Sequence, residues 1–113
     1  RLIEFMDYTI LIGKSAKDND ELTLKHAHKQ ELWLHAKDVS GSHVVVKNKC
    51  GKKISKDVIE RSAQLAAFHS KRKGESLCPV AYTLKKFVRK RKGDPPGFVV
   101  VEKETVILVE PKG

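Results

Sequence analysis

The sequence predicts a single α+β domain in which a mainly antiparallel sheet is packed by one long and one short helix. The length of 113 residues falls within the commonest size of one domain. Short β-branched and alternating segments outnumber helical ones and follow the order β-α-β-β-α-β-β-β. The C-terminal connections are too short to hold a second layer of helices, which favours an antiparallel sheet.

The N-terminal part predicts one strand and one short helix. Residues 8–12 (YTILI) form a β-branched, aromatic run that ends at Gly13, and this pattern indicates a strand and a turn. Asn19 or Asp20 can cap a helix that runs to about His28.

The middle of the chain predicts a strand pair followed by the longer helix. Alternating residues 32–35 and the apolar run 44–47 indicate two strands joined by a loop over 38–42. Ser55 begins a segment with an apolar stripe at helical spacing, which ends in the basic residues 71–73 before a glycine. We expect this helix to cover one face of the sheet.

The C-terminal part predicts a long strand and a closing hairpin. Residues 80–92 indicate a strand whose broken alternation requires a bulge or a kink. A loop over 93–97 contains two prolines, and the apolar runs 98–101 and 106–109 indicate a hairpin that turns at 103–104.

Basic charge is concentrated in the second half of the chain. The formal net charge is +9, and residues 51–113 carry fifteen basic and seven acidic side chains, against eight and seven in residues 1–50. Such a field favours polyanions as partners, nucleic acid first and anionic membrane surfaces second, although many basic domains are only solubilised by it.

The densest basic segment runs from Lys85 to Lys92, where six of eight residues are basic. On an extended strand, side chains of one face repeat every ~7 Å, comparable with neighbouring phosphates of a nucleic acid. The alternative is an edge strand that lysines protect from aggregation. We predict sequence-independent phosphate contacts by Lys86, Arg89, Lys90, Arg91 and Lys92.

Trp33, the single tryptophan, lies between two leucines whose side chains should point to the other face of the strand. It can therefore be exposed beside His35 and Lys37, where an aromatic side chain stacks on unpaired bases. The alternative is a tryptophan packed under a neighbouring helix, because buried aromatics dominate protein cores.

Two motifs that could carry catalysis are incomplete. Gly13-Lys14-Ser15 lacks the earlier glycine of a phosphate-binding loop, because Tyr8 stands at that position. Ser42 and His43 lie near further triad residue types, but Gly41-Ser42-His43 leads into a strand and no second glycine completes a nucleophile elbow. We expect no enzyme activity.

Metal, cofactor and membrane binding are not indicated. His26 and His28 diverge on a helix because of their i,i+2 spacing, so they cannot chelate one ion from one face. Cys50 and Cys78 are far apart and form no CxxC motif, so we expect two reduced thiols. We expect no cofactor, no small-molecule substrate, no membrane span and no membrane partner.

Several short motifs follow one another over nearly the whole chain. They are Gly13-Lys14, NDELT at 19–23, LWLH at 32–35, DVSGSHVV at 38–45, AAFHSK at 66–71, Pro79-Val80, Tyr82-Thr83, Lys92-Gly93 and Pro96-Gly97. The Trp-x-His pair followed by Gly-Ser-His-Val is the most specific combination. In these motifs the sequence resembles the RNA-binding domain of the NFACT family.

The resemblance implies a non-catalytic RNA-binding module of a cytoplasmic, ribosome-associated quality control protein. Members of that family bind tRNA and the large ribosomal subunit with an obstructed peptidyl-tRNA, and they support C-terminal tailing of stalled chains. Trp33, His35, Ser42 and His43 transfer as motif positions. Because the family has further domains and this chain begins with Arg1, we expect residues 1–113 to be an excerpt, and tailing is not assigned to it alone.

Two alternatives belong to other classes of function. The first is a protein-interaction module whose basic face docks acidic ribosomal or adhesin-type partners, and RNase-insensitive association with the ribosome would favour it. The second is a hydrolase built on Ser42 and His43, which predicts that Ser42→Ala abolishes ester turnover while RNA affinity stays intact.

Overall fold

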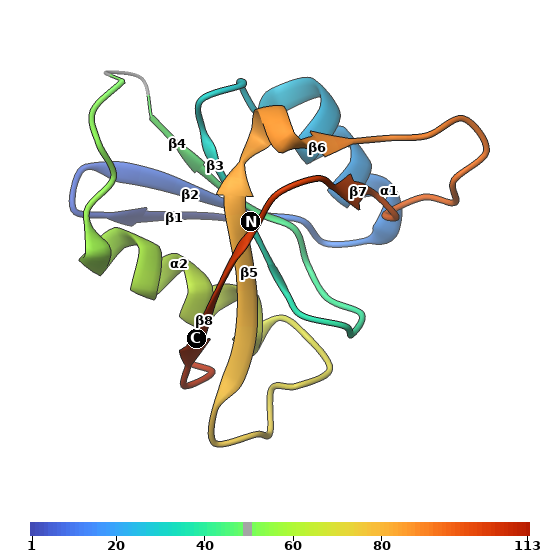
Figure 1. The fold of residues 1–113 in the computed structure, drawn as a ribbon. Helices are drawn as coiled ribbons and strands as arrows, with labels where there is room; N and C mark the ends of the chain where they lie inside the picture. The colour runs from blue at the N-terminus through green and yellow to red at the C-terminus, as the bar shows by residue number, and fades with distance from the viewer. Residues whose placement is uncertain (49–50) are drawn as a thin grey trace.

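A six-stranded antiparallel sheet forms the centre of the molecule (Figure 1). The structure is a computed structural model that describes residues 1–48 and 51–113. The strand order is β1-β2-β4-β3-β5-β8. The bounds are Leu2–Phe5 for β1, Tyr8–Ile12 for β2, Leu32–Ala36 for β3, Val44–Lys47 for β4, Cys78–Leu84 for β5 and Thr105–Val109 for β8. The predicted α+β class with a mainly antiparallel sheet is confirmed.

The first strand, β1, is absent from the sequence-based prediction. It pairs with β2 through a turn at Met6 and Asp7, whose φ angles of 48° and 67° are both positive. A two-residue hairpin turn requires such angles and usually contains Asn-Gly or Asp-Gly. Because Met-Asp carries no such signal, the hairpin could not be recognised from the sequence.

One face of the sheet is covered by the long helix α2, Lys56–Phe68 (Figure 1). The predicted cap is confirmed, since Ser55 Oγ accepts a hydrogen bond from Val58 N at 3.5 Å. Apolar side chains of the helix, including Val58 and Leu65, pack on the inward residues of the strands in a continuous core. The predicted end is wrong: the helix stops at Phe68, and residues 71–74 form a turn.

The opposite face is covered by short and irregular elements. They are α1 (Ala16–Glu21), the π-helix η1 (Leu22–His26), the 3₁₀ turn η2 (Lys85–Phe87) and a two-stranded sheet of β6 (Val88–Arg89) and β7 (Val100–Val101). A second apolar cluster packs Leu22, Ala27 and Val88 on Trp33 and Val45 of the sheet.

The first helix begins earlier than predicted. Ser15 caps α1, because its Oγ accepts a hydrogen bond from Asp18 N at 3.1 Å. The caps predicted at Asn19 and Asp20 are therefore wrong, and both residues lie within the helix. Their side chains are free to bond other parts of the chain.

The C-terminal strands also differ from the prediction. The irregularity expected within 80–92 is the η2 turn, which ends β5 because the amides of Lys85 and Lys86 donate to the carbonyls of Glu31 and Lys29, at 2.9 and 3.0 Å. The predicted closing hairpin does not form, since β7 pairs with β6 while β8 pairs with β5.

Two remaining sequence-based points concern thiols and membranes. Cys78 is a buried free thiol, whereas Cys50 lies outside the described residues. Within the ranges 1–48 and 51–113, no helix is long and apolar enough to cross a membrane.

Candidate nucleic-acid interface

A groove of about 1230 Å³ opens on the sheet face that carries Trp33 and His35. These two residues and His43 form part of its lining, together with Ala81 of β5. One wall comes from residues 14–16 at the start of α1, and a second wall comes from segments 38–42 and 69–71. A third wall is the segment 95–99 that follows the basic run.

Three rings meet at the floor of the groove. Trp33 and His35 are parallel, with centroids 6.0 Å apart and an interplanar angle of 7°. His43 lies edge-on to both, at 5.2 Å from Trp33 and 5.4 Å from His35. Trp33 is 3% exposed, so the prediction that it stacks on bases is wrong and the packed alternative holds. His35 is half-buried and remains accessible.

The hydroxyl of Thr23 connects two of these rings. The indole Nε1–H of Trp33 can only donate, so Thr23 Oγ1 accepts from it at 3.1 Å. The hydroxyl proton is then donated to His43 Nδ1 at 2.7 Å, and His43 Nε2–H donates to the Gly97 carbonyl at 3.0 Å. This chain of bonds selects one neutral tautomer of His43.

The surroundings of His43 also hold it in the neutral form. Burial, followed by the neighbouring His35, lowers the pKa of His43 from 6.5 to about 4. The pKa of His35 is lowered as well, chiefly by burial, although the backbone carbonyls of Ala36 and Gly41 oppose the shift. The floor of the groove is therefore uncharged at neutral pH and consists of ring surfaces.

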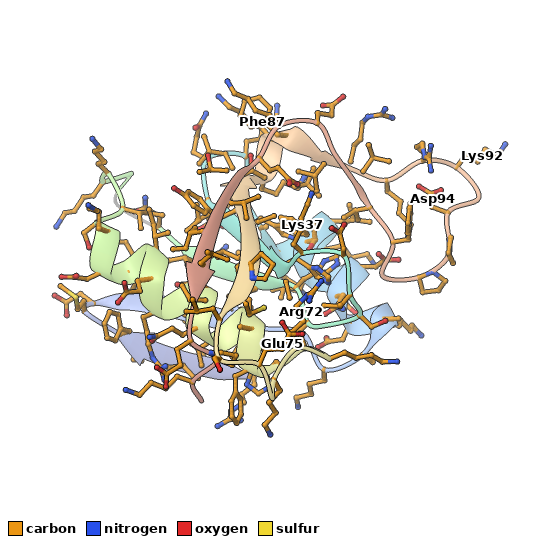
Figure 2. All side chains as sticks on the ribbon, turned by 60° about the horizontal axis from the view of Figure 1, so that its bottom comes forward. Lys37, Arg72, Glu75, Phe87, Lys92 and Asp94 are labelled. Atoms are coloured by element: carbon orange, nitrogen blue, oxygen red, sulfur yellow. The ribbon has the colours of Figure 1, made fainter. Side chains whose placement is uncertain are left out.

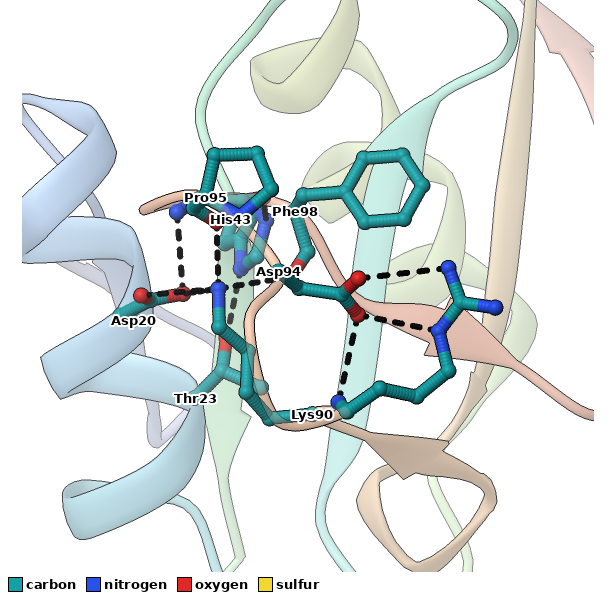
Figure 3. Close-up of polar contacts among 9 residues, drawn as sticks. Asp20, Thr23, His43, Lys90, Asp94, Pro95 and Phe98 are labelled. Carbon is teal, nitrogen blue, oxygen red and sulfur yellow. Dashed lines mark hydrogen bonds and ion pairs between the residues drawn. The ribbon is translucent and has the colours of Figure 1, made fainter.

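Lys90 holds the wall segment 95–98 against α1 (Figure 3). Its Nζ lies 3.1 Å from Asp20 Oδ2 and donates to the carbonyls of Pro95 at 2.5 Å and Phe98 at 2.8 Å. Asp20 Oδ1 also accepts from Gly97 N at 3.0 Å. All three ammonium protons therefore have acceptors inside the protein. Lys90 positions the wall and has no free proton for the phosphate contact predicted from the sequence.

The other basic residues of the run do not form one ridge. Arg89 pairs with Glu102 at 3.0 Å, and Arg91 pairs with Asp94 at 3.2 Å. Lys92 lies at the tip of the loop, well away from the labelled Phe87 (Figure 2). The chain turns at η2 and leaves the strand after Arg89, so the prediction of regularly spaced charges is wrong. None of Lys86, Arg89, Lys90, Arg91 and Lys92 lines the groove.

The remaining predicted site residues do line the groove, but one of them is neutralised. Lys37 forms an ion pair with Glu104, which is the main reason why its pKa is raised. Ser42 is held by its backbone, since its N–H donates to the His69 carbonyl at 3.0 Å. The structure thus brings Trp33, His35, Lys37, Ser42 and His43 together.

The segment 38–42 is fixed to the end of α2 by close backbone contact. Gly41 forms an antiparallel β-bridge with Ser70. A Cβ at Gly41 would lie 2.8 Å from Ser70 Cβ, so the close approach of the two backbones requires glycine. Lys71 N also donates to the Ser40 carbonyl at 3.0 Å. The early end of α2 is what places Lys71 in the wall of the groove.

Asn19 fixes the start of α1 to the same segment. Its side chain accepts from His43 N at 3.0 Å and donates to the Gly41 carbonyl at 3.2 Å. A Cβ at Gly13 would lie 1.8 Å from Asn19 Oδ1, so glycine is required for this network. Lys14 follows directly and lines the groove.

Three groove residues were missed as binding candidates: Lys14, Lys71 and Phe98. The Gly-Lys pair and the Pro-Pro-Gly-Phe segment were visible signals for the first and the last of them. Nothing local marks Lys71, because its place depends on where α2 ends. In the described part of the chain, no group of three or more His, Cys, Asp or Glu side chains is arranged to hold a metal ion.

The fold and the groove define a small α+β domain with a net positive charge and a recessed surface lined by Trp33, His35 and His43. The chain belongs to the NFACT protein RNA binding domain family, whose family model matches residues 2–102. It is 39% identical over 103 residues to the Rqc2 homolog RqcH of Bacillus subtilis and 42% identical over 102 residues to that of Streptococcus suis.

These matches cover 91% and 90% of this chain and 18% of each relative, so the chain spans about a fifth of their length. The fold is also similar to a solved structure, the C-terminal part of the fibronectin/fibrinogen-binding protein from Streptococcus suis. The TM-score is 0.87 at 41% identity, covering 93% of this chain and 41% of that one.

Proposed function

We propose that this chain is a non-catalytic RNA-binding domain of a cytoplasmic ribosome quality control factor and that the groove is its RNA-binding site. The proposed ligands are tRNA and the RNA of the large ribosomal subunit. The observation that carries the proposal is the groove itself, which gathers five of the predicted site residues in a member of an RNA-binding family. RqcH relatives at about 40% identity support the assignment to ribosome quality control.

Two rim lysines supply the positive charge of the proposed site. Lys14 and Lys71 are exposed, and neither has an ion-pair partner among the described residues. Arg89, Arg91 and Lys37 are instead paired with carboxylates. When an ammonium group binds a phosphate, the nucleic acid releases condensed counterions. An unpaired ammonium group can do so directly, whereas a paired one must first break its internal ion pair. The rim lysines are therefore the stronger candidates for phosphate contacts.

The hydrogen bonds of His43 argue against the hydrolase alternative. A general base needs a ring nitrogen within reach of the nucleophile that it deprotonates. Both ring nitrogens of His43 are engaged elsewhere, by Thr23 and by the Gly97 carbonyl. Ser42 therefore has no base in His43, which supports a binding function.

A salt titration tests the proposal. The 113-residue chain is titrated with tRNA, an RNA duplex and a DNA duplex of matched charge between about 50 and 200 mM salt. We expect tighter binding to tRNA that persists in part at high salt. Equal affinity for all three ligands that vanishes with salt would indicate a general polyanion surface instead.

The rim lysines are tested in the same assay with a matched pair of variants. Lys14→Gln/Lys71→Gln should lower the salt slope by up to about 2, one unit for each lost phosphate contact. The control Lys56→Gln/Lys112→Gln changes two exposed lysines at the start of α2 and near the C-terminus. An equal salt slope in both variants would show that the groove does not contact the RNA. In a separate assay, ribosome association that survives RNase would favour the protein-interaction alternative.

A further inference from the structure

We propose that the groove takes an unpaired, single-stranded segment of RNA, in which a base stacks on Phe98 while Lys14 and Lys71 contact the flanking phosphates. This inference rests on the proposed RNA-binding function and specifies which form of RNA the site takes. Three features of the groove support it.

The first feature is an exposed aromatic ring on a fixed wall. Phe98 lines the groove and is 50% exposed. Its carbonyl accepts from Lys90 Nζ at 2.8 Å and its N–H donates to the Pro95 carbonyl at 3.1 Å, so the backbone is held at both ends. The Phe98 ring points away from the Lys90 network (Figure 3). A ring held in this way can stack on a base without first losing much backbone freedom.

A cation beside the same ring strengthens this platform. The guanidinium carbon of Arg91 lies 5.9 Å from the Phe98 ring centroid, and Arg91 is held by Asp94. A cation at this distance is attracted to the aromatic ring, which restricts the orientation of the Phe98 side chain. Phe98 is therefore a better stacking residue than the buried Trp33.

The second feature is the lack of free charge on the floor. The floor is built from Trp33, His35 and His43, and the polar atoms of Trp33 and His43 already have partners in the protein. Trp33 and His43 are buried and His35 is the accessible ring, so the floor offers the His35 ring to a base and no counter-charge to phosphates. In an RNA duplex the bases are stacked inside the helix and the groups presented outward are phosphates and 2′-hydroxyls. The bases of a duplex would therefore not contact the His35 ring, whereas an unpaired base can enter the groove and contact it.

The third feature is the distribution of charge around the rim. Lys14 and Lys71 are exposed on the walls formed by the start of α1 and the turn after α2, whereas Lys37 is neutralised by Glu104. Phosphates are therefore favoured beside the first two lysines, whereas the neutral Lys37–Glu104 pair does not attract them. The volume of about 1230 Å³ exceeds the roughly 300–1,000 Å³ of a typical small-ligand pocket. The groove thus has room for more than one base.

Fluorescence anisotropy tests the inference with a labelled 12-nucleotide single-stranded RNA and the same RNA in a blunt duplex, each titrated with the wild-type chain and four variants. Phe98→Ala removes the ring, Phe98→Leu keeps an apolar side chain without a ring, and Phe98→Tyr keeps the ring. The control Leu108→Ala removes another exposed apolar side chain, on the edge strand β8 and outside the groove. Thermal unfolding of each variant shows whether it is folded.

We expect the wild-type chain to prefer the single strand over the duplex. Phe98→Ala and Phe98→Leu should weaken single-strand binding by about 5- to 100-fold, while Phe98→Tyr and Leu108→Ala stay near wild type. If Phe98→Ala does not fold, Phe98→Leu decides the question. Equal binding of both RNAs, with Phe98→Leu no weaker than Leu108→Ala, would overturn this inference and leave RNA binding intact. No binding of either RNA by the wild type would overturn the proposed function as well.

Discussion

The two faces of the central sheet are built on different principles. On one face, the 13-residue helix α2 covers an apolar core in which Leu34, Val44 and Leu65 are fully buried. On the other face, short elements leave a groove and are held by side-chain hydrogen bonds and ion pairs, centred on Thr23 and Lys90. The first face supplies stability through burial of apolar surface, and the second supplies a site through directional bonds.

The largest effect is expected on the α2 face. Leu65→Ala removes a fully buried side chain from the core and should lower the free energy of unfolding by about 2–5 kcal/mol. Urea unfolding measures this loss. Because the groove lies on the other face, RNA affinity measured under conditions where the variant is fully folded should not change. A parallel loss of RNA affinity would show that the two faces are not independent.

Thr23→Val tests the hydrogen-bond network of the groove face. The change keeps the shape of the side chain but leaves Trp33 Nε1–H and His43 Nδ1 without their shared partner. Each buried group left unpaired costs about 1–3 kcal/mol. The control Thr23→Ser retains the hydroxyl. We expect urea unfolding to show a clear loss for valine and a smaller one for serine, together with weaker RNA binding for valine.

The pH dependence of stability tests the neutral state of His43. Its pKa is about 4 in the folded chain and 6.5 in the unfolded chain, so between these values the unfolded chain binds the extra proton. Stability should therefore fall as the pH drops from 6.5 to 4, by about 3 kcal/mol from this residue. His43→Gln should show a flatter profile in this window. Profiles of equal steepness would contradict the assignment of His43 as a buried neutral imidazole.

The sequence allowed the α2 face to be predicted more completely than the groove face. The stripe of α2 and the alternation in 32–35 are local patterns with periods of 3.6 and 2, and both elements form, although α2 stops at Phe68, before its predicted end. The end of β5 depends instead on amide bonds from Lys85 and Lys86 to the carbonyls of Glu31 and Lys29. Contacts of this kind join distant parts of the chain and leave no local pattern.

The site residues show the same limit. The motif residues Trp33, His35 and His43 were correctly grouped, because neighbouring strands bring them to one face. The count of basic residues could not show that Lys90 is held by Asp20, seventy positions earlier in the chain. Whether a charge is free or neutralised is a tertiary property, and for this reason the basic run gave a misleading picture of the site.

The smallest effect is expected at the loop tip. Lys92 is exposed, lies outside the groove and has no ion-pair partner in the described residues. Lys92→Gln should leave stability unchanged and reduce the salt slope of RNA binding by less than about 1. A drop as large as that of the Lys14→Gln/Lys71→Gln variant would extend the RNA footprint from the groove to the basic loop.

The most direct test of the central claim is to map the RNA contact on the two faces by NMR. A ¹⁵N-labelled chain is titrated with the single-stranded RNA, and shifts of the backbone amide signals are followed. We predict that the largest shifts belong to residues of the groove walls, such as Lys14, Ser42, Lys71 and Phe98, while the exposed residues Lys56, Asp57 and Glu60 of α2 do not shift. Larger shifts on α2 than in the groove would contradict the account.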